Sequence, residues 1–147
     1  MRHFEIRAAS AEDFPAIRRL IRRVQINPTG LDWRRFVLAV DMSGGMLGCG
    51  QLKPHAEATV ELASIAVEPA HRHEGIAGAI IEHLMARAPR PLYLTCRSSL
   101  EGFYKKWGFR AIPEAEMPTY FRRLSRLASI LRSLAHNDDA LLVMVLK

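Results

Sequence analysis

The pattern of hydrophobic and polar residues follows two periods along the chain, and it predicts strands and helices in mixed order. Runs rich in β-branched and aromatic residues indicate strands. Seven segments have this character: residues 4–8, 36–41, 46–53, 59–67, 91–96, 109–112 and 140–146. The run at 59–67 is apolar on both faces, which is typical of a central strand.

Apolar residues at helical spacing predict four helices. The helix starts are a Ser10 cap, the region of Gly75, a capping box formed by Ser98 and Glu101, and the region of Tyr120. A short helical piece is expected near residues 32–35. The last helix, residues 120–135, is apolar over a wide arc: Phe121, Leu124, Leu127, Ala128, Leu131 and Leu134. Core packing, a homodimer contact and a lid over a substrate are all open for this arc.

The order of the segments is that of a mixed α/β protein, in which strands first meander and then alternate with helices. The segment Ser43-Gly44-Gly45 predicts a hairpin between the second and third strands. A chain of 147 residues can bury a full core, and we expect one domain over residues 1–147. With 49% hydrophobic and 24% charged residues, the chain is not a disordered or low-complexity protein.

Composition also excludes several classes of protein. Two cysteines, Cys49 and Cys96, are too few for a disulfide framework or a structural zinc site. The first ten residues lack the apolar core of an export signal. The longest apolar run, residues 140–146, is far shorter than the roughly 20 residues of a membrane-spanning helix. We therefore expect a cytoplasmic protein that does not bind membranes.

The charge balance is basic, with a net charge of +6 and arginine at 17 of the 21 basic positions. Such a balance suits nucleic acid, an anionic membrane or an anionic small ligand. Aromatic residues make up only 7% of the chain and are not interleaved with the arginines, so we expect no nucleic-acid partner. We therefore interpret the arginines as residues on solvated helix faces, where their positive potential helps to steer an anionic ligand.

The most informative stretch runs from Glu61 to Gly78, where a buried strand leads through a basic turn into a glycine-bearing helix. The first turn of a helix has unpaired N–H groups and a partial positive charge, so it binds anions. Small residues at 75, 77 and 78 let a phosphate approach the backbone, and Arg72 adds a positive charge. Neither the P-loop pattern nor the dinucleotide fingerprint is present.

The pattern Arg72-x-x-Gly75-x-Ala77, after a strand that ends at 65–67, resembles the acyl-CoA pyrophosphate loop of the GNAT superfamily of N-acetyltransferases. The segment 103–109, with Tyr104 and the Gly-Phe pair that follows, resembles that family's second motif. The resemblance follows the element order over most of the chain and is sharp from about 61 to 109.

The resemblance implies a GNAT-like acyl-CoA N-acyltransferase fold, with a central, mostly antiparallel sheet flanked by helices. The helix at 120–135, between the last two strands, is an addition to this pattern. The implied cosubstrate is acetyl-CoA, without a metal, bound in a gap beside the strand that precedes the loop. The implied contacts are Ile65, Ala66 and Val67 for the pantetheine arm and Arg72, His73, Glu74, Gly75, Ile76, Ala77 and Gly78 for the pyrophosphate.

The resemblance also suggests two catalytic residues. Tyr104 matches a tyrosine that protonates the leaving thiolate, and Glu61 lies where several members keep a glutamate base. General acid–base chemistry fits both, since an amine must lose a proton to attack a thioester and the departing sulfur must gain one. The alternatives are a core tyrosine and a glutamate in a structural salt bridge. A base that acts through water is also open.

The acceptor is predicted to be a small primary amine or amino acid, attacked directly. Arg97 stands where many members have an asparagine, and it would suit an acceptor carboxylate. The alternatives are a protein N-terminus or lysine, and a non-catalytic acyl-CoA-binding module. Cys96 is interpreted as a buried thiol rather than an acyl carrier. His71 and His73 lack metal-ligand spacing, and His55 and His83 receive no role.

Overall fold

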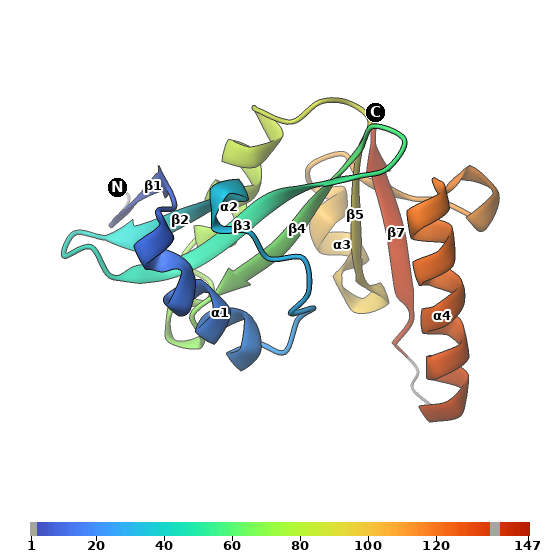
Figure 1. Ribbon diagram of the computed structural model, residues 1–147, viewed down its shortest axis with the longest axis horizontal. Coiled ribbons are helices and arrows are strands. Elements are labelled where there is room, and N and C mark those ends of the chain that lie inside the picture. Colours follow the sequence, from blue (N-terminus) through green and yellow to red (C-terminus); the bar gives the residue numbers. More distant parts are fainter. Residues whose placement is uncertain (1–2, 136–138) are drawn as a thin grey trace. The chain divides into compact units, whose positions relative to one another are not determined.

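The computed structural model describes residues 3–135 and 139–147. Seven strands form one sheet in the order β1-β2-β3-β4-β5-β7-β6 (Figure 1). The strands are β1 Phe4–Ala8, β2 Phe36–Asp41, β3 Met46–His55, β4 Thr59–Val67, β5 Leu92–Arg97, β6 Arg110–Ala111 and β7 Leu141–Leu146. The α-helices are α1 Phe14–Arg23, α2 Ile76–Met85, α3 Glu101–Lys105 and α4 Thr119–Ala135.

These elements confirm the predicted order of strands and helices, and most boundaries agree to within two residues. Strand β6 has two residues where four were expected, and α1 starts at Phe14, after a 3-10 turn at Ala11–Asp13. The predicted hairpin joins β2 to β3, and the short piece before β2 is a 3-10 turn, Trp33–Arg35. All the pairings described are antiparallel except that of β4 with β5.

The chain forms two compact units, which are described separately. Unit 1 comprises Met1–Lys53 and Leu62–Ala88, and unit 2 comprises Pro54–Glu61 and Pro89–Lys147. Strand β4 contributes its first residues to unit 2 and the rest to unit 1.

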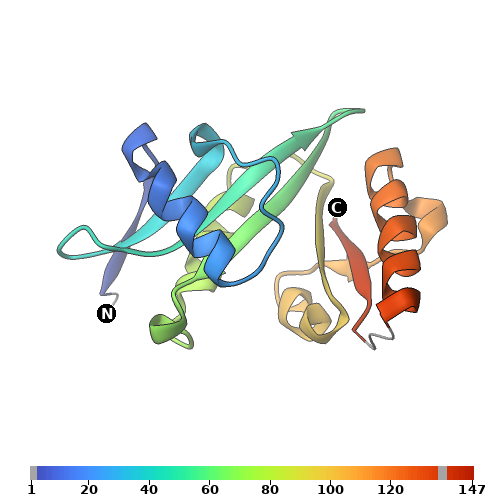
Figure 2. The same ribbon diagram turned by 60° about the horizontal axis from the view of Figure 1, so that its bottom comes forward.

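In unit 1, helices α1 and α2 cover opposite faces of β2 and β3 (Figures 1 and 2). The face under α1 carries alternate residues of β2, because side chains along a strand point to opposite sides. Its core is completed by three residues of α1, by Cys49 of β3 and by Ala66 of β4. The members from α1 and β2 are Ile17, Leu20, Ile21, Phe36, Leu38 and Val40.

The other face of unit 1 admits α2 at very close range because it carries two glycines. A methyl group at Gly48 would lie 2.8 Å from the carbonyl oxygen of Ala66 and 3.0 Å from Ile76 of α2. One at Gly50 would lie 2.7 Å from Ile80. The fully buried, apolar face of α2 therefore packs directly on the backbone of β3.

In unit 2, α3 and α4 lie on opposite sides of β5 and β7 (Figure 2). Phe121 of α4 packs with Val143 and Val145 of β7, and Tyr93 of β5 packs against this cluster. The register pairs Tyr93 with Val145 and Leu94 with Met144, so successive residues of β5 alternate between the two sides.

The predicted capping box at the start of α3 is wrong. The Ser98 and Ser99 hydroxyls donate to the carboxylate of Asp139, at 2.6 and 3.1 Å, and the Ser99 N–H also donates to it. Glu101, the second member of the predicted box, instead pairs with Lys105. The Ser98 N–H, which the Glu101 side chain would have bonded in a capping box, instead donates to the carbonyl oxygen of Ala140 at 2.7 Å.

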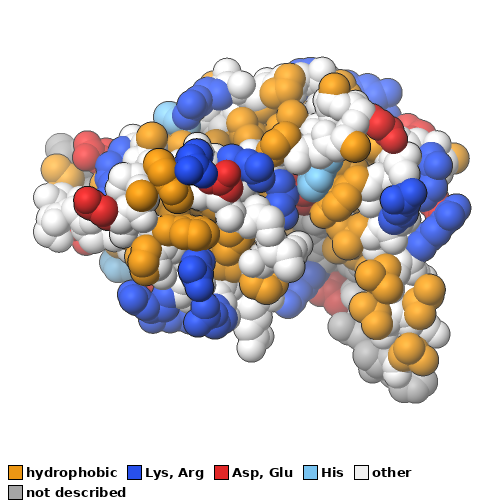
Figure 3. Space-filling view, in the orientation of Figure 1, with side chains coloured by type: hydrophobic (Ala, Val, Ile, Leu, Met, Phe, Trp, Pro, Cys, Tyr) orange, Lys and Arg blue, Asp and Glu red, His pale blue; other side chains and the backbone are white. Residues whose placement is uncertain are grey.

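Of the three possibilities left open for the apolar arc of α4, core packing applies only to its first part. Phe121 is fully buried, whereas Leu127, Leu131 and Leu134 are 54–75% exposed. Figure 3 shows these apolar side chains along α4 at its lower end. The sheet of unit 2 covers only the first turns of this 17-residue helix. A homodimer contact through the exposed face stays a prediction.

None of the described helices is long and apolar enough to cross a membrane.

Candidate active site

Glu61 is a buried carboxylate in unit 2, with only 6% of its surface exposed. It lies in the short parallel pairing of β4 with β5, opposite Tyr93. A buried carboxylate needs partners, because removal of a charge from water is costly. Both Glu61 oxygens have one: His55 Nε2 lies 2.7 Å from Oε1, and the Thr95 hydroxyl donates to Oε2 at 3.4 Å.

His55 is held in place by an aromatic contact as well as by this hydrogen bond. Its ring stacks on Tyr120 of α4, with centroids 3.7 Å apart and planes inclined by 17°. Phe121 meets the same imidazole edge-on at 5.6 Å. The pKa of Tyr120 is raised, first by burial and then by the negative charge of Glu61. The first turn of α4 therefore packs directly against the His55–Glu61 pair.

Sequence reasoning missed His55 and assigned it no role. The residue is six positions from Glu61 across the β3–β4 turn, so the hairpin brings the two side chains together. A histidine and a glutamate on either side of a hairpin turn were the available signal, but only the structure shows that their side chains meet. The structural alternative for Glu61, a salt bridge, stays open, with His55 rather than an arginine as the partner.

Tyr104 lies in α3 and is buried, with 8% of its surface exposed. Burial raises the pKa of its hydroxyl to about 12, and the nearby Cys96 thiol contributes to the shift. The hydroxyl therefore keeps its proton throughout the neutral and mildly alkaline range. Such a group can donate a proton, and this is the property expected of a general acid.

The two cysteines are not activated nucleophiles. Burial raises the pKa of the Cys49 thiol to about 12 and that of the Cys96 thiol to about 11. A thiol attacks as the thiolate, which is scarce at neutral pH when the pKa is this high. The interpretation of Cys96 as a buried thiol, rather than an acyl carrier, agrees with its environment.

The loop at the start of α2 is exposed from Arg72 to Gly75. Gly75 is the N-cap residue, with a left-handed backbone at φ 81°, and no side chain caps this helix end in the described part of the chain. His73 is also left-handed, at φ 67°. The N–H groups of the first turn of α2 are therefore open to an anion, and Ala77 and Gly78 add little bulk beside them.

Strand β4 deviates from regular pleating at Ser64, whose φ is +60°. Gln51 donates to the Ser64 hydroxyl at 2.8 Å and thereby holds the deviation in place. This break interrupts the regular alternation of side chains between Glu61 and Val67. Ile65 instead faces α2, and Ala66 belongs to the core under α1.

The remaining predicted site residues differ in their surroundings. Arg97 is exposed at the end of β5. The hydrogen bond from Ser98 is the main cause of the lowered pKa of Asp139, and the positive charge of Arg97 is the smallest. Glu74 lies 3.3 Å from His71 in an exposed ion pair. The described residues contain no group of three histidine, cysteine or acidic side chains that could hold a metal ion.

Several solved structures share this fold. N-acetylglutamate synthase from Neisseria gonorrhoeae, complexed with coenzyme A and N-acetyl-glutamate, is 24% identical, with a TM-score of 0.73 over 100% of this chain and 36% of that one. A Mycobacterium tuberculosis protein in complex with CoA is 23% identical, with a TM-score of 0.72 over 97% of this chain and 99% of that one. The ribosomal-protein-S18-alanine N-acetyltransferase from Escherichia coli is 18% identical, with a TM-score of 0.69 over 97% and 92%.

The chain thus spans about a third of the N-acetylglutamate synthase that it matches. No curated protein sequence matches it significantly. The family model of the acetyltransferase (GNAT) domain matches residues 32–111, more than half of the chain. That range contains the loop before α2, Glu61 and Tyr104. The chain belongs to the GNAT acetyltransferase family.

Proposed function

We propose that the protein transfers an acetyl group from acetyl-CoA to a primary amine by direct attack. The match of residues 32–111 to the acetyltransferase domain is the observation that carries this proposal. The solved relatives that hold CoA support the choice of cosubstrate.

The loop from Arg72 to Gly78 is assigned to the pyrophosphate of acetyl-CoA. Its exposed, uncapped helix end offers N–H donors and a partial positive charge, and Arg72 adds a formal one. In β4, residues 65–67 come after Val60 and Glu61, the two positions that pair with β5. We assign their backbone groups to the pantetheine arm and to the carbonyl oxygen of the thioester, which becomes negative in the transition state.

Glu61 acts as the base, directly or through water, and Tyr104 acts as the acid. The amine nitrogen bonds to the acetyl carbon, and one amine proton passes to Glu61. The carbon–sulfur bond then breaks, and the CoA sulfur takes a proton from Tyr104. The Tyr104 hydroxyl is protonated at neutral pH, as a general acid must be. His55 and Thr95 hold the two Glu61 oxygens and so orient the base.

The acceptor is proposed to be a small amine or amino acid, with Arg97 available for an acceptor carboxylate. The fold relatives include an enzyme named for N-acetylglutamate and one named for a ribosomal protein alanine. A protein N-terminus or lysine is therefore the second acceptor class to be assayed.

A thermal melt with and without acetyl-CoA tests the cosubstrate. Acetyl-CoA at 100 times its Kd stabilises the folded protein by about 2.7 kcal/mol, which raises the Tm by roughly 5–10 °C for a domain of this size. Arg72→Ala should reduce the rise. Arg19→Ala removes an exposed arginine of α1 and should leave the rise unchanged.

The outcomes distinguish the classes of function. A rise in Tm together with release of free thiol from acetyl-CoA on addition of an amine supports the enzyme. A rise without turnover of any small or peptide amine indicates a non-catalytic acyl-CoA-binding module. If millimolar acetyl-CoA leaves the Tm unchanged, the assignment of the loop is wrong.

A further inference from the structure

Ser64 has a backbone conformation that is unusual for the inside of a strand. Its φ of +60° lies in the left-handed region, which a residue with a Cβ atom adopts only at a cost in energy. Among the described residues, Ser64 alone combines this conformation with a place inside a strand. The other non-glycine residues with a positive φ lie in turns and loops: Gln25, Glu57, Ala58 and His73. No turn requires the conformation of Ser64, so contacts from other elements must hold it.

Two side chains of β3 hold Ser64. The Gln51 amide nitrogen donates to the Ser64 hydroxyl at 2.8 Å, and the Cys49 thiol donates to the Ser64 carbonyl oxygen at 3.7 Å. Both side chains are fully buried, and they are two residues apart, so they share one face of the strand. A thiol is a weak donor, and Gln51 therefore makes the stronger of the two contacts.

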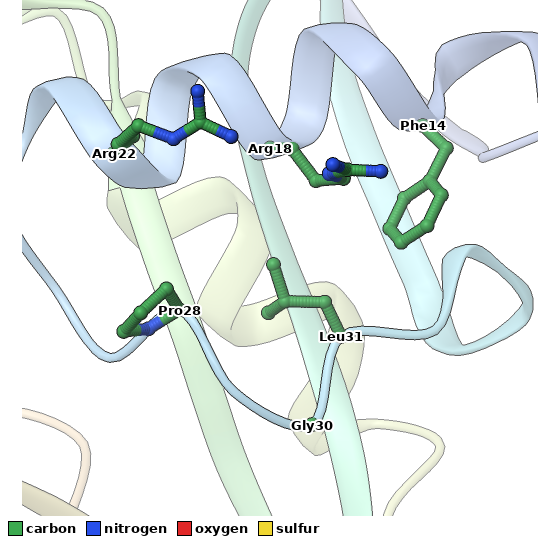
Figure 4. A pocket seen from close by; sticks show the side chains of 6 residues that line it. All are labelled: Phe14, Arg18, Arg22, Pro28, Gly30 and Leu31. Carbon is green, nitrogen blue, oxygen red and sulfur yellow. The ribbon is translucent and has the colours of Figure 1, made fainter.

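The same amide nitrogen also donates to the carbonyl oxygen of Gly30, at 3.4 Å. Gly30 belongs to the loop that follows α1, which passes in front of the strands in Figure 4. A carbonyl oxygen can only accept, so this contact fixes which end of the Gln51 amide is the donor. The donor end is thereby directed toward Ser64.

The other end of the Gln51 amide has no such support. Its Oε1 is buried and has no hydrogen-bond partner among the described residues. A buried acceptor without a partner lowers stability, so an apolar side chain of the same length would serve folding better at this position. A side chain that is unfavourable for folding points to a functional reason for its presence.

The residues after Ser64 are those assigned above to the pantetheine arm and the thioester. Ile65 faces α2, and Ala66 belongs to the core under α1, so their side chains are directed to the two faces of the sheet. What this segment offers to a ligand is therefore its backbone. Gln51, Ser64 and residues 65–67 all belong to unit 1, and so does the loop from 72 to 78.

We propose that Gln51 is a positioning residue for acetyl transfer, because it holds Ser64 in the left-handed conformation that aims the backbone N–H groups of residues 65–67 at the thioester carbonyl oxygen. Gln51 is fully buried and acts through Ser64. Donors that are already aimed at this oxygen stabilise the negative charge that develops there as the amine attacks. The inference rests on the proposed function for the identity of the ligand, whereas the hold of Gln51 on Ser64 is a property of the protein alone.

The hold on Ser64 is tested first, by NMR of the free protein. In Gln51→Met the side chain keeps its length and loses both hydrogen bonds of the amide. We expect the ¹³Cα and ¹³Cβ shifts of Ser64 to move toward those of an extended strand, because the left-handed conformation loses its main support. Unchanged shifts in a folded Gln51→Met protein would overturn the inference.

The matched control is Lys53→Met, at another buried position of β3. Lys53 donates to the Thr29 carbonyl of the same loop at 3.1 Å, and no hydrogen bond between it and Ser64 is described. Lys53→Met should leave the Ser64 shifts unchanged. If both variants move these shifts equally, the loop rather than the Gln51–Ser64 bond determines the conformation, and the inference is wrong.

The bound thioester is tested next, with [1-¹³C]acetyl-CoA and no acceptor. Hydrogen bonds to the carbonyl oxygen polarise the carbonyl group, so its ¹³C signal in the complex should lie downfield of that of free acetyl-CoA. Gln51→Met should reduce this displacement, and Lys53→Met should preserve it. An equal displacement in the wild type and in Gln51→Met would contradict the positioning role.

A change at residue 64 itself separates its conformation from general damage to the fold. Glycine adopts a positive φ without a supporting contact, so Ser64→Gly added to Gln51→Met should restore the displacement of the carbonyl signal. Ser64→Ala loses the hydroxyl but keeps the Cβ atom, and it should behave like Gln51→Met. If Ser64→Gly restores nothing, the defect of Gln51→Met has another cause and the inference fails.

Kinetics connect the conformation to the reaction, with an amine identified by release of free thiol. At saturating acetyl-CoA, Gln51→Met should lower kcat at least about tenfold, since misplaced donors lose contacts that are strongest in the transition state. The Kd for CoA should change far less, because the loop from 72 to 78 is untouched. Added Ser64→Gly should recover part of the lost kcat.

The outcomes for the two proposals are distinguishable. If acetyl-CoA is turned over and Gln51→Met keeps the full kcat, this inference fails and the proposed function stands. If the wild type neither binds nor turns over acetyl-CoA, the proposed function fails, and the catalytic role of Gln51 fails with it. The Ser64 shifts of the free protein then still show whether Gln51 holds that residue.

Discussion

In the candidate site, the positions of the Glu61 and His55 side chains are set by contacts with each other and with neighbouring residues. The carboxylate is buried, and the imidazole is fixed both by the 2.7 Å contact and by the stacked Tyr120 ring. If Glu61 is the base proposed above, proton transfer from the amine is favoured when its carboxylate is held in one orientation. We therefore regard His55 as a positioning residue that acts through Glu61.

Replacement of His55 separates positioning from packing. In His55→Phe the ring that stacks on Tyr120 is retained and the bond to Glu61 is lost. We expect kcat to fall at least about tenfold, since general-base catalysis contributes roughly 10²–10⁴-fold. The increase in Tm caused by acetyl-CoA should stay the same.

The conservative variant His55→Gln keeps a donor near Glu61 and should recover part of the lost kcat. If His55→Phe retains full kcat, the pair does not orient the base. Steady-state kinetics with saturating acetyl-CoA would measure both variants.

At the scale of single elements, the two faces of the unit 1 sheet are built differently. The α1 face is filled by large side chains, whereas the α2 face depends on two glycines in β3 that let the helix approach the backbone. Close contact of this kind tolerates little added volume.

Gly48→Ala should therefore destabilise the protein by about 1–3 kcal/mol, because the new methyl group would meet backbone as well as side-chain atoms. Gly102→Ala is the matched control. It lies in α3, has no atom within 4 Å of the added methyl group, and should stabilise by about 0.5–1 kcal/mol through helix propensity. Urea unfolding of both variants would measure the difference, and equal stabilities would contradict the packing argument.

The start of α1 is stabilised by an acidic side chain whose effect depends on pH. Asp13 accepts from the Ser10 N–H at 2.7 Å and pairs with Arg7 at 2.8 Å. The Arg7 hydrogen bond is the main cause of a pKa well below the usual range for Asp13. A depressed folded-state pKa stabilises the protein above the unfolded-state pKa, and this contribution is lost as the pH falls toward the folded-state value.

Asp13→Asn should cost about 1 kcal/mol of unfolding free energy at pH 7, a value kept modest by the partial exposure of the pair. The deficit should begin to shrink below about pH 4, where the carboxyl of the unfolded wild-type chain gains a proton, and should shrink further as the pH falls toward the lower folded-state pKa. Glu12→Gln removes an exposed charge from the same turn and should show neither effect. A deficit for Asp13→Asn that is independent of pH would exclude the charge as its cause.

At the scale of the whole molecule, the net charge of +6 favours the approach of a polyanionic cosubstrate. Salt screens such long-range attraction, since the Debye length falls from about 10 Å at 0.1 M to about 3 Å at 1 M. We expect the KM for acetyl-CoA to rise severalfold between 0.05 and 0.5 M NaCl, on the order of the steering effects seen in charged proteins. The KM for an uncharged amine acceptor should not rise with salt. Initial-rate measurements at each salt concentration would detect the difference.

The sequence by itself determined the order of the strands and helices and the family to which the chain belongs. Both depend on information that is local in the chain: apolar periodicity in each element, and a short motif such as Arg72-x-x-Gly75-x-Ala77 at a helix start. Such signals are readable because the residues that specify them lie within a few positions of one another.

Contacts between distant segments were decided only by the tertiary structure. The Asp139 carboxylate displaced a capping box that the local sequence favoured, and the pairing of β3 with β4 brought His55 to Glu61. The exposed half of α4 is apolar in sequence but lies beyond the surface that the unit 2 sheet covers. In each case residues outside the local segment determine the outcome, because burial and hydrogen bonding depend on which surfaces meet in space.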